Sequence, residues 1–294
     1  MDDRDLPAAR FEEHRDHLNA VAHRMLGSLS EAEDAVQEAW LRLSRTDAGE
    51  VANLGGWLTT VVGRGCLAML RSRTARREEP LVERGLPDPV VSRADGPDPE
   101  QQALVADAVG PALLVVLQSL TPAERLAFVL HDMFGVPFED IAPIVDRTPA
   151  AARKPASRAR GRVRGAAPAP DPDPHRQRAV VEAFVAAARG GDFEALLSVL
   201  DPDVVLRADT AGPGALTVIR GAAAVARRAL TFARLAESAR PALVNGAAGV
   251  VSTRDGRPFS VMSFTVRDGR IVALDVLAAP ERLSALDLAA LDAS

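Results

Sequence analysis

The 294-residue chain has few of the residues on which several classes of protein depend. It has one cysteine, Cys66, which excludes an internal disulfide and a cysteine-rich zinc site. It has no run of about 18 apolar residues and its N-terminus is acidic, so it predicts neither a membrane span nor a secretory signal. We therefore expect a cytoplasmic protein without membrane contact.

The common signatures of catalysis are also missing. No nucleophile is paired with a base, the five histidines are scattered, and no spacing is typical of metal ligands. We therefore predict that the protein is not an enzyme and carries no cofactor or metal ion.

The net charge of −5 conceals an uneven distribution of charge along the chain. Residues 61–77 contain five arginines and no acid, and residues 147–165 contain seven cations and no acid. Because a solvated helix face normally mixes both signs, two acid-free segments are more typical of a protein that contacts a polyanion at two places.

Two proline-rich segments divide the chain into three parts. Alternating Pro and Asp disfavour both helix and strand, so we interpret these segments as linkers. The predicted order is a helical domain at 1–80, a linker at 81–100, a second helical domain at 101–165, a linker at 166–175 and a third domain at 176–294.

The second domain ends in a helix-turn-helix pattern. Thr121 and Glu124 form a predicted capping box. Thr148 with Pro149 begins the last helix, and the pattern of two closely spaced helices is typical of a unit whose second helix enters the DNA major groove. Pro155 lies in the interior of that helix, where proline costs about 3 kcal/mol, so we predict a kink or break between Ala151 and Pro155.

The sequence of the third domain predicts an α+β fold. Three helical segments are followed by runs of alternating β-forming residues, and Asp255-Gly256 and Asp268-Gly269 are typical hairpin turns.

The order of these parts resembles the extracytoplasmic-function (ECF) sigma factors, in particular the SigJ-like group with a C-terminal SnoaL-like domain. The resemblance depends on "EAEDAVQEAWLRL", "WLTTVVGRGCLAMLRSRTARR", "TPAERLAFVLHDMFGVPFEDIAPIV", "TPAAARKPASRARGRVRG", "ALVNGAAGVVS" and "GRIVALDVLAAPERL". It implies a multidomain protein with two all-α sigma domains, the second containing the helix-turn-helix, followed by an α+β SnoaL-like cone. It also implies a sigma factor that binds core RNA polymerase and directs promoter-specific initiation, regulated by its C-terminal domain.

The resemblance assigns roles to three sets of residues. The set expected to bind the clamp helices of the largest polymerase subunit is Asp34, Gln37, Glu38, Leu41 and Arg42. The set expected to hold melted promoter DNA is Arg64, Arg71, Arg73, Arg76 and Arg77. The set expected to contact the upstream promoter element is Arg147, Arg153, Lys154, Arg158, Arg160, Arg162 and Arg164. In the last set, we expect Arg153 and Lys154 to reach base edges and the later arginines to contact phosphates.

The first linker departs from the pattern of the group. The group usually has Trp-Leu-Pro-Glu-Pro there, whereas this chain has "GLPDP" at 85–89. Without the apolar surface of the tryptophan, the sequence indicates no anchor that would dock this linker on a neighbouring domain.

Two alternative functions remain open at this point. The cone of the group implies a pocket, for which we predict a polar lining of Arg207, Asp209, Asn245 and Asp275 and a small ligand of unknown identity. Such carboxylates also allow a cyclase or isomerase fused to a DNA-binding unit. A stand-alone helix-turn-helix repressor explains residues 121–165, but it leaves the arginine-rich segment after Trp57 without a use.

Overall fold

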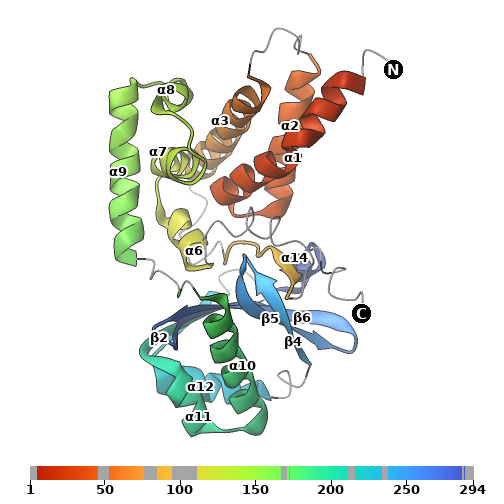
Figure 1. Ribbon diagram of the computed structural model, residues 1–294, viewed down its shortest axis with the longest axis vertical. Coiled ribbons are helices and arrows are strands. Elements are labelled where there is room, and N and C mark those ends of the chain that lie inside the picture. Colours follow the sequence, from red (N-terminus) through yellow and green to blue (C-terminus); the bar gives the residue numbers. More distant parts are fainter. Residues whose placement is uncertain are drawn as a thin grey trace. The chain divides into compact units, whose positions relative to one another are not determined.

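The computed structural model describes residues 5–45, 53–75, 85–94, 111–166, 171, 173–210, 216–233, 238–286 and 288. The chain divides into two compact units, each built from two stretches of sequence. Unit 1 is Met1–Glu78 with Val116–Ala166, and unit 2 is Glu79–Val115 with Ala167–Ser294. The helices of unit 1 and the sheet of unit 2 are distinguished by colour in Figure 1.

The N-terminal half of unit 1 is a bundle of α1 (Asp5–Leu26), α2 (Leu29–Leu43) and α3 (Leu54–Ala75). Phe11, Leu18 and Met25 of α1 are fully buried, as the apolar spacing of the sequence predicts. Cys66 of α3 is buried in the same core, and burial raises the pKa of its thiol to about 12. No helix among the described ranges is long and apolar enough to cross a membrane.

The C-terminal half of unit 1 contains the predicted helix-turn-helix. Its elements are α6 (Pro111–Ser119), which begins in unit 2, α7 (Pro122–Ala127), the π-helix η1 (Phe128–Met133), α8 (Phe138–Ile141), the 3-10 helix η2 (Ala142–Ile144) and α9 (Pro149–Ala166). The capping box of Thr121 and Glu124 is present, which confirms the predicted start of α7. Asp146, with φ of 54°, makes the turn before α9.

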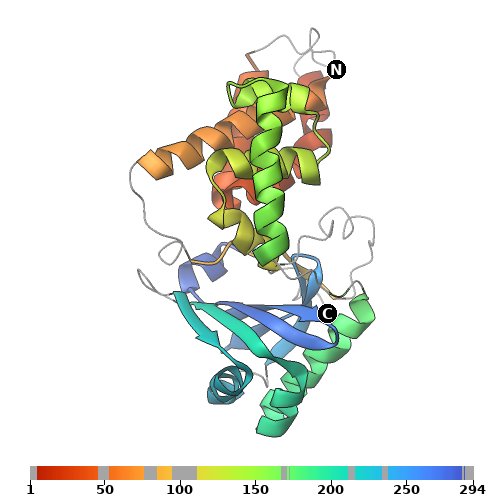
Figure 2. The same ribbon diagram turned by 90° about the vertical axis from the view of Figure 1, so that its left-hand side faces the viewer.

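Helix α9 is continuous from Pro149 to Ala166 (Figure 2), so it survives Pro155 without the break that the sequence allowed between Ala151 and Pro155. Ala152, Ala156 and Ala159 have no exposed surface, and α9 packs along α7 and α8. Tertiary packing of this small-residue face therefore maintains the helix although proline contributes no N–H group.

Unit 2 is a seven-stranded sheet in the order β1-β4-β5-β6-β7-β2-β3. The strands are β1 (Val91–Arg93), β2 (Leu200–Asp209), β3 (Leu216–Arg220), β4 (Ala239–Val244), β5 (Ala247–Arg254), β6 (Arg257–Arg267) and β7 (Arg270–Leu277). β2 pairs with β7 in parallel, and the other pairs are antiparallel. The hairpins at Asp255 and Asp268 both have the predicted left-handed residues.

One face of the sheet packs against α10 (Pro174–Gly190), α11 (Phe193–Val199) and α12 (Ala222–Thr231). Phe184 and Phe264 meet edge to face at 5.4 Å in this core, and Leu196, Val225 and Leu274 are fully buried. A short helix, α14 (Pro280–Ser284), follows β7. The α+β prediction is confirmed, although β3 and α14 were not predicted.

Part of the predicted first linker is ordered as part of unit 2. Val91, Ser92 and Arg93 form β1 and pair with β4 at Val244, Leu243 and Ala242. The prediction that this whole segment lacks strand structure is therefore wrong. The Pro-Asp pattern is interrupted after Pro89, and the β-forming residues that follow complete an edge of the sheet.

Replacing Pro155 with Ala should stabilise unit 1, because it restores the N–H group that α9 lacks without adding a larger side chain. We expect a gain of about 1–3 kcal/mol in the free energy of unfolding. Both tryptophans, Trp40 and Trp57, lie in unit 1, so their fluorescence during urea unfolding reports this unit alone. Pro149→Ala is the matched control, because proline is favourable at the first helical position. Equal unfolding midpoints for Pro155→Ala and the parent protein would contradict the prediction.

Candidate nucleic-acid and protein interfaces

The exposed face of α2 contains all five residues predicted to bind a protein partner. Asp34, Gln37, Glu38, Leu41 and Arg42 are exposed, whereas the opposite face of the helix is buried in the bundle. The Leu41 residue is 41% exposed, which is unusual for a large apolar residue in the described part of the chain. Arg42 and Glu38 form an exposed ion pair one helical turn apart, at 3.1 Å. This face therefore combines acidic groups with an apolar contact point.

The predicted DNA-contacting arginines of α3 do not all have the same environment. Arg64 and Arg71 are exposed, and a separation of seven residues places them on one helix face. Arg73, in contrast, forms an ion pair with Glu31 of α2 and donates to the carbonyl of Leu26 at 3.5 Å. Arg73 therefore joins the helices of the bundle, which contradicts its predicted role on DNA. Arg76 and Arg77 lie outside the described residues.

The cations of α9 and the preceding turn divide into two groups. Arg147, Lys154, Arg158 and Arg164 are exposed, and the structure describes no ion pair for them. Arg160 pairs with Asp132 at 2.5 Å, Arg162 with Glu124 at 3.3 Å, and Arg153 lies 3.7 Å from Glu139.

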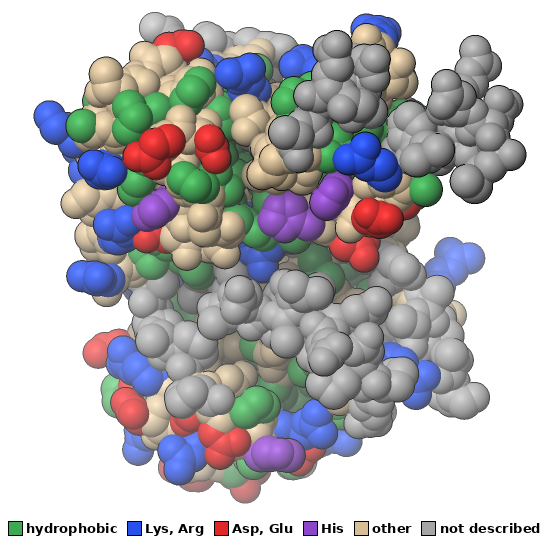
Figure 3. All heavy atoms as spheres, turned by 45° about the horizontal axis from the view of Figure 1, so that its top comes forward, with side chains coloured by type: hydrophobic (Ala, Val, Ile, Leu, Met, Phe, Trp, Pro, Cys, Tyr) green, Lys and Arg blue, Asp and Glu red, His purple; other side chains and the backbone are tan. Residues whose placement is uncertain are grey.

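The ion pairs of Arg153, Arg160 and Arg162 weaken the case for the DNA contacts predicted for these residues. Arg160 and Arg162 were predicted to contact phosphates, but their charges are partly balanced within the helix-turn-helix. Arg153 was predicted to reach base edges, and its guanidinium lies 5.7 Å from the centre of the Phe138 ring. Figure 3 shows basic side chains along the margin on which α9 lies in Figure 1. The four cations for which no ion pair is described, Arg147, Lys154, Arg158 and Arg164, are therefore the better candidates for contact with a polyanion.

The two helical halves of unit 1 are joined by specific contacts. Arg125 of α7 is 3% exposed, and its Nη1 donates to the carbonyl of Met25 in α1 at 2.8 Å. His17 of α1 packs edge to face on Phe134 at 5.2 Å and hydrogen-bonds with Thr59, and burial lowers the pKa of its ring. The N-terminal bundle and the helix-turn-helix segment therefore pack together within unit 1.

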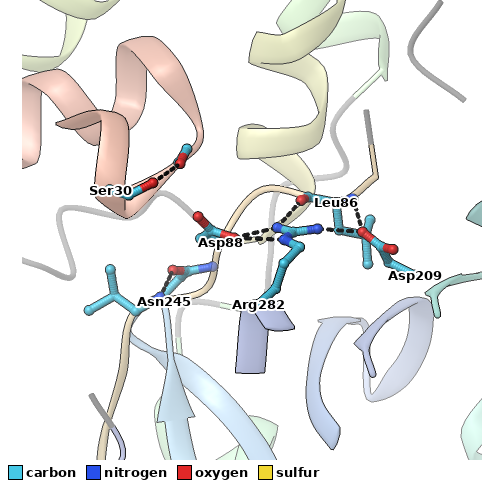
Figure 4. A network of polar contacts seen from close by, with 8 residues as sticks. Ser30, Leu86, Asp88, Asp209, Asn245 and Arg282 are labelled. Atoms are coloured by element: carbon cyan, nitrogen blue, oxygen red, sulfur yellow. Dashed lines mark hydrogen bonds and ion pairs between the residues drawn. The ribbon is translucent and has the colours of Figure 1, made fainter. Parts of the chain in front are cut away.

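In unit 2, a network of polar contacts joins the first linker to the sheet and to α14 (Figure 4). The Nε atom of Arg282 donates to Asp88 at 2.9 Å, Nη1 donates to Asp209, and Nη2 donates to the Leu86 carbonyl. Asp209 also accepts the backbone N–H of Leu86 at 2.9 Å. We call Arg282, Asp88, Asp209 and the Leu86 backbone the Arg282 network. The prediction that the linker has no means of docking is therefore wrong, because polar contacts replace the missing tryptophan.

Two further features fix the position of the linker on unit 2. Asn245, in a left-handed turn, accepts from the Val90 N–H at 2.9 Å and donates its own N–H to the Val90 carbonyl at 2.8 Å. Gly85 has φ of +70°, and a Cβ atom there would collide with the carboxylate of Asp209. Only glycine fits this approach without displacing the network.

The four residues predicted to line the pocket of the cone lie elsewhere. A cavity of about 290 Å³ lies under the helix-covered face of the sheet and is lined by residues such as Phe184, Leu206, Ala208, Leu274 and Val276. Arg207, Asp209 and Asp275 alternate with these residues along β2 and β7, so they face the opposite side. There Arg207 holds Asp275 in a bidentate pair at 2.5 and 3.1 Å. Asn245 lies in the β4–β5 turn and contacts the linker.

Sequence reasoning missed Arg282, Asp88 and Gly85. Asp88 looked like one of several linker acids, and Arg282 like a surface residue after the last strand. The only signals were that "APERL" ends a segment used for the family resemblance and that "GLPDP" stands where the group has its linker signature, and neither says that the two meet.

Comparisons with known proteins agree with this order of elements. A family model described as sigma-70 region 2 matches residues 10–76, and one described as sigma-70 region 4 matches residues 111–163. The chain is 40% identical to the ECF RNA polymerase sigma factor SigJ of Mycobacterium tuberculosis, over 95% of this chain and 94% of that protein. It is 33% identical to the probable ECF sigma factor SigI of the same species, over 97% and 98% of the two chains. The crystal structure of M. tuberculosis SigJ matches with a TM-score of 0.77 at 36% identity, covering 96% of this chain and 99% of that one.

Replacing Lys154 or Arg158 with Ala should weaken the salt dependence of DNA binding. Each contact with a phosphate contributes about 0.9 to the slope of log K against log salt concentration, so each variant should lower the slope by about that amount. The measurement is a titration of duplex DNA with the complex of this chain and core RNA polymerase at several salt concentrations. Arg227→Ala, an exposed change in unit 2, is the control and should keep the parent slope. Unchanged slopes for both α9 variants would remove these residues from the DNA interface.

Proposed function

The chain belongs to the ECF RNA polymerase sigma factors, and we propose that it uses α2 to bind core polymerase and α3 with α9 to bind promoter DNA. As a sigma factor, it directs promoter-specific transcription initiation. One observation carries this assignment of surfaces. The match to sigma-70 region 2 contains α2 and α3, and the match to sigma-70 region 4 contains most of α9. Since polymerase and chromosome share the bacterial cytoplasm, we place the protein there.

The exposed face of α2 supports the polymerase contact. Asp34 and Glu38 offer negative charge to a basic partner, and Leu41 offers apolar surface one helical turn beyond Glu38. Charge complementarity raises the rate and specificity of association, while a desolvated apolar contact contributes most of the affinity. The proposed partner of this face is the pair of clamp helices of the largest polymerase subunit.

The exposed cations support a division of labour on DNA. Arg64 and Arg71 on one face of α3 are suited to the phosphates of melted DNA, which region 2 is proposed to hold. Lys154 near the start of α9 is suited to a base edge, and Arg158 and Arg164 farther along are suited to phosphates. Arg147 adds a phosphate contact from the turn before the helix.

We further propose that unit 2 regulates initiation and does not catalyse a reaction. Among its described residues, the lining of the 290 Å³ cavity includes no Asp, Glu, His, Cys or Lys, so no general base faces that space. The acidic residues that could support a cyclase, Asp209 and Asp275, are engaged by Arg282 and Arg207. This arrangement favours a regulatory domain over the enzyme alternative.

The Arg282 network provides the physical basis for regulation. Residues 85–93, which connect region 2 to region 4, are bound to unit 2 by the network, by Asn245 and by β1. A chain extends at most about 3.6 Å per residue, so fixing the middle of a linker limits how far its two ends can separate. Unit 2 would therefore restrict the distance between the two promoter-binding regions.

Leu41→Glu tests the polymerase contact. A buried negative charge in place of leucine should weaken binding to core polymerase by at least about tenfold, because an unpaired charge is costly in a desolvated interface. Affinity for fluorescently labelled core polymerase and transcription from a supplied promoter are the two measurements. Val218→Glu, at the exposed Val218 of β3, introduces the same charge elsewhere and should leave both unchanged. Initiation by the polymerase without this chain, or equal binding by the parent protein and Leu41→Glu, would contradict the proposal.

Arg282→Ala tests regulation by the linker. Loss of the guanidinium removes the cation that bridges Asp88 and Asp209, so the segment around Leu86 should be held less tightly. We expect faster hydrogen exchange at the amides of Leu86 and Val90 and a higher transcript yield from a matched promoter.

The control for this test is Arg267→Ala, which removes an exposed arginine that lies 3.8 Å from the carboxylate of its neighbour Asp268. Slow exchange at Leu86 in Arg282→Ala would show that the network does not hold the linker. Fast exchange with unchanged transcript yield would show that the linker is held but does not regulate. Neither result would affect the assignment to the sigma factors.

A further inference from the structure

The cavity of unit 2 has the size and lining of a small-molecule site. Its volume of about 290 Å³ is at the lower end of the range of ligand pockets, about 300–1,000 Å³. Protein interiors are close-packed and rarely leave voids much larger than a water molecule. The rings of Phe184 and Phe259 and the side chain of Met262 line it, so most of its wall is apolar.

The polar groups of this lining are few and lie at defined positions. Ser252 of β5 and Ser260 of β6 are register partners, both 5% exposed, and their side chains border the same space. Arg228 of α12 also lines the cavity, and its guanidinium lies 4.6 Å from the centre of the Phe232 ring. A second guanidinium, that of Arg254, lies 4.0 Å from the ring of the lining residue Phe259.

Within the described part of the lining, the charged side chain is the cation of Arg228. The positive Arg228 faces a cavity that shows no described acid, and neither Arg228 nor Arg254 has a described ion pair. An apolar wall beside a guanidinium is complementary to a molecule with a hydrophobic body and an anionic group. Two adjacent hydroxyl groups can donate hydrogen bonds to a further oxygen.

We propose that the cavity of unit 2 binds a small amphipathic organic acid, whose apolar ring or chain lies among Phe184, Phe259 and Met262 and whose carboxylate pairs with Arg228. The acid is bound without chemical change, because the described lining offers it no base or activated nucleophile. This inference concerns unit 2 alone and does not depend on the proposed contacts with polymerase and DNA.

The proposal is tested by calorimetric titration of the full chain with 2-naphthoate and with its uncharged analogue 2-naphthamide. The two probes have nearly the same shape and differ in charge. We expect 2-naphthoate to bind with one site per chain and at least about tenfold more tightly, because a charge-assisted hydrogen bond is stronger than a neutral one. Absence of binding by 2-naphthoate, or equal affinities for the two probes, would overturn the proposal.

Two variants locate the binding site, and a third is the matched control. Arg228→Gln should remove the preference for the acid while leaving the affinity for 2-naphthamide within about twofold, which also shows that the variant is folded. Ala229→Phe, which places a ring in the cavity, should abolish binding of both probes while circular dichroism remains that of the parent. Arg227→Gln changes the neighbouring exposed arginine of α12, which does not line the cavity, and should bind both probes as the parent does. Parent-like binding by Arg228→Gln and Ala229→Phe would place the ligand outside this cavity and refute the inference.

Discussion

The guanidinium of Arg282 is the single group through which three parts of unit 2 are held together. It contacts Asp88 of the linker, Asp209 at the end of β2 and the backbone of Leu86, and it belongs to α14. Its planar fork can satisfy several acceptors at once, which a lysine ammonium on a flexible stem does less well. Because the two carboxylates are mostly buried, removal of the cation would leave like charges close together in a poorly solvated place. The position of the segment around Leu86 and Asp88 therefore depends strongly on this side chain, while Asn245 and the β1–β4 pairing hold the residues that follow.

The alternation of side chains along β2 and β7 gives the sheet two separate faces. Leu206 and Ala208 border the cavity. The alternate residues, Arg207 and Asp209, lie on the opposite face, where they contact Asp275 and Arg282. The backbone connects the two sides directly, because the N–H of the cavity-lining Ala278 donates to the carbonyl of Asp209 at 2.7 Å. A ligand that shifts β2 or the end of β7 would thus also act on the Arg282 network. The same short segment of sheet therefore lies between the proposed ligand site and the Arg282 network.

The sequence predicted the elements that have local signals, and it failed where distant segments meet. The capping box of Thr121 and Glu124 and the turns at Asp255 and Asp268 follow from neighbouring residues alone, whereas the residues of α2 were assigned by the family resemblance. Local propensity predicted a kink or break at Pro155, but α9 is continuous there because tertiary packing offsets a propensity cost of about 3 kcal/mol. Arg73 and Arg162 looked like free cations, since the acids that pair with them lie on other helices. The Arg282 network joins residues almost two hundred positions apart, and its charges individually resemble ordinary surface residues.

The packing within unit 1 imposes a further constraint on promoter binding. A Cβ atom at Gly63 of α3 would lie 3.3 Å from Leu130 and 3.5 Å from Leu126, so α3 approaches the second helical half closely through this glycine. The next residue, Arg64, is exposed, so the side of α3 that we propose to contact DNA is accessible in the packed form. The packing therefore does not hide the candidate DNA contacts of α3, but it fixes their distance from α9. Some polymerases or promoters require a different distance between α3 and α9. Such a partner must bind the form in which the two helical halves are separated more tightly than the packed form. The difference in binding free energy must be at least the free energy of the contacts between the two halves. Because the linker joins the same two regions, its attachment to unit 2 and the Arg125–Met25 contact act on one equilibrium, the separation of region 2 from region 4.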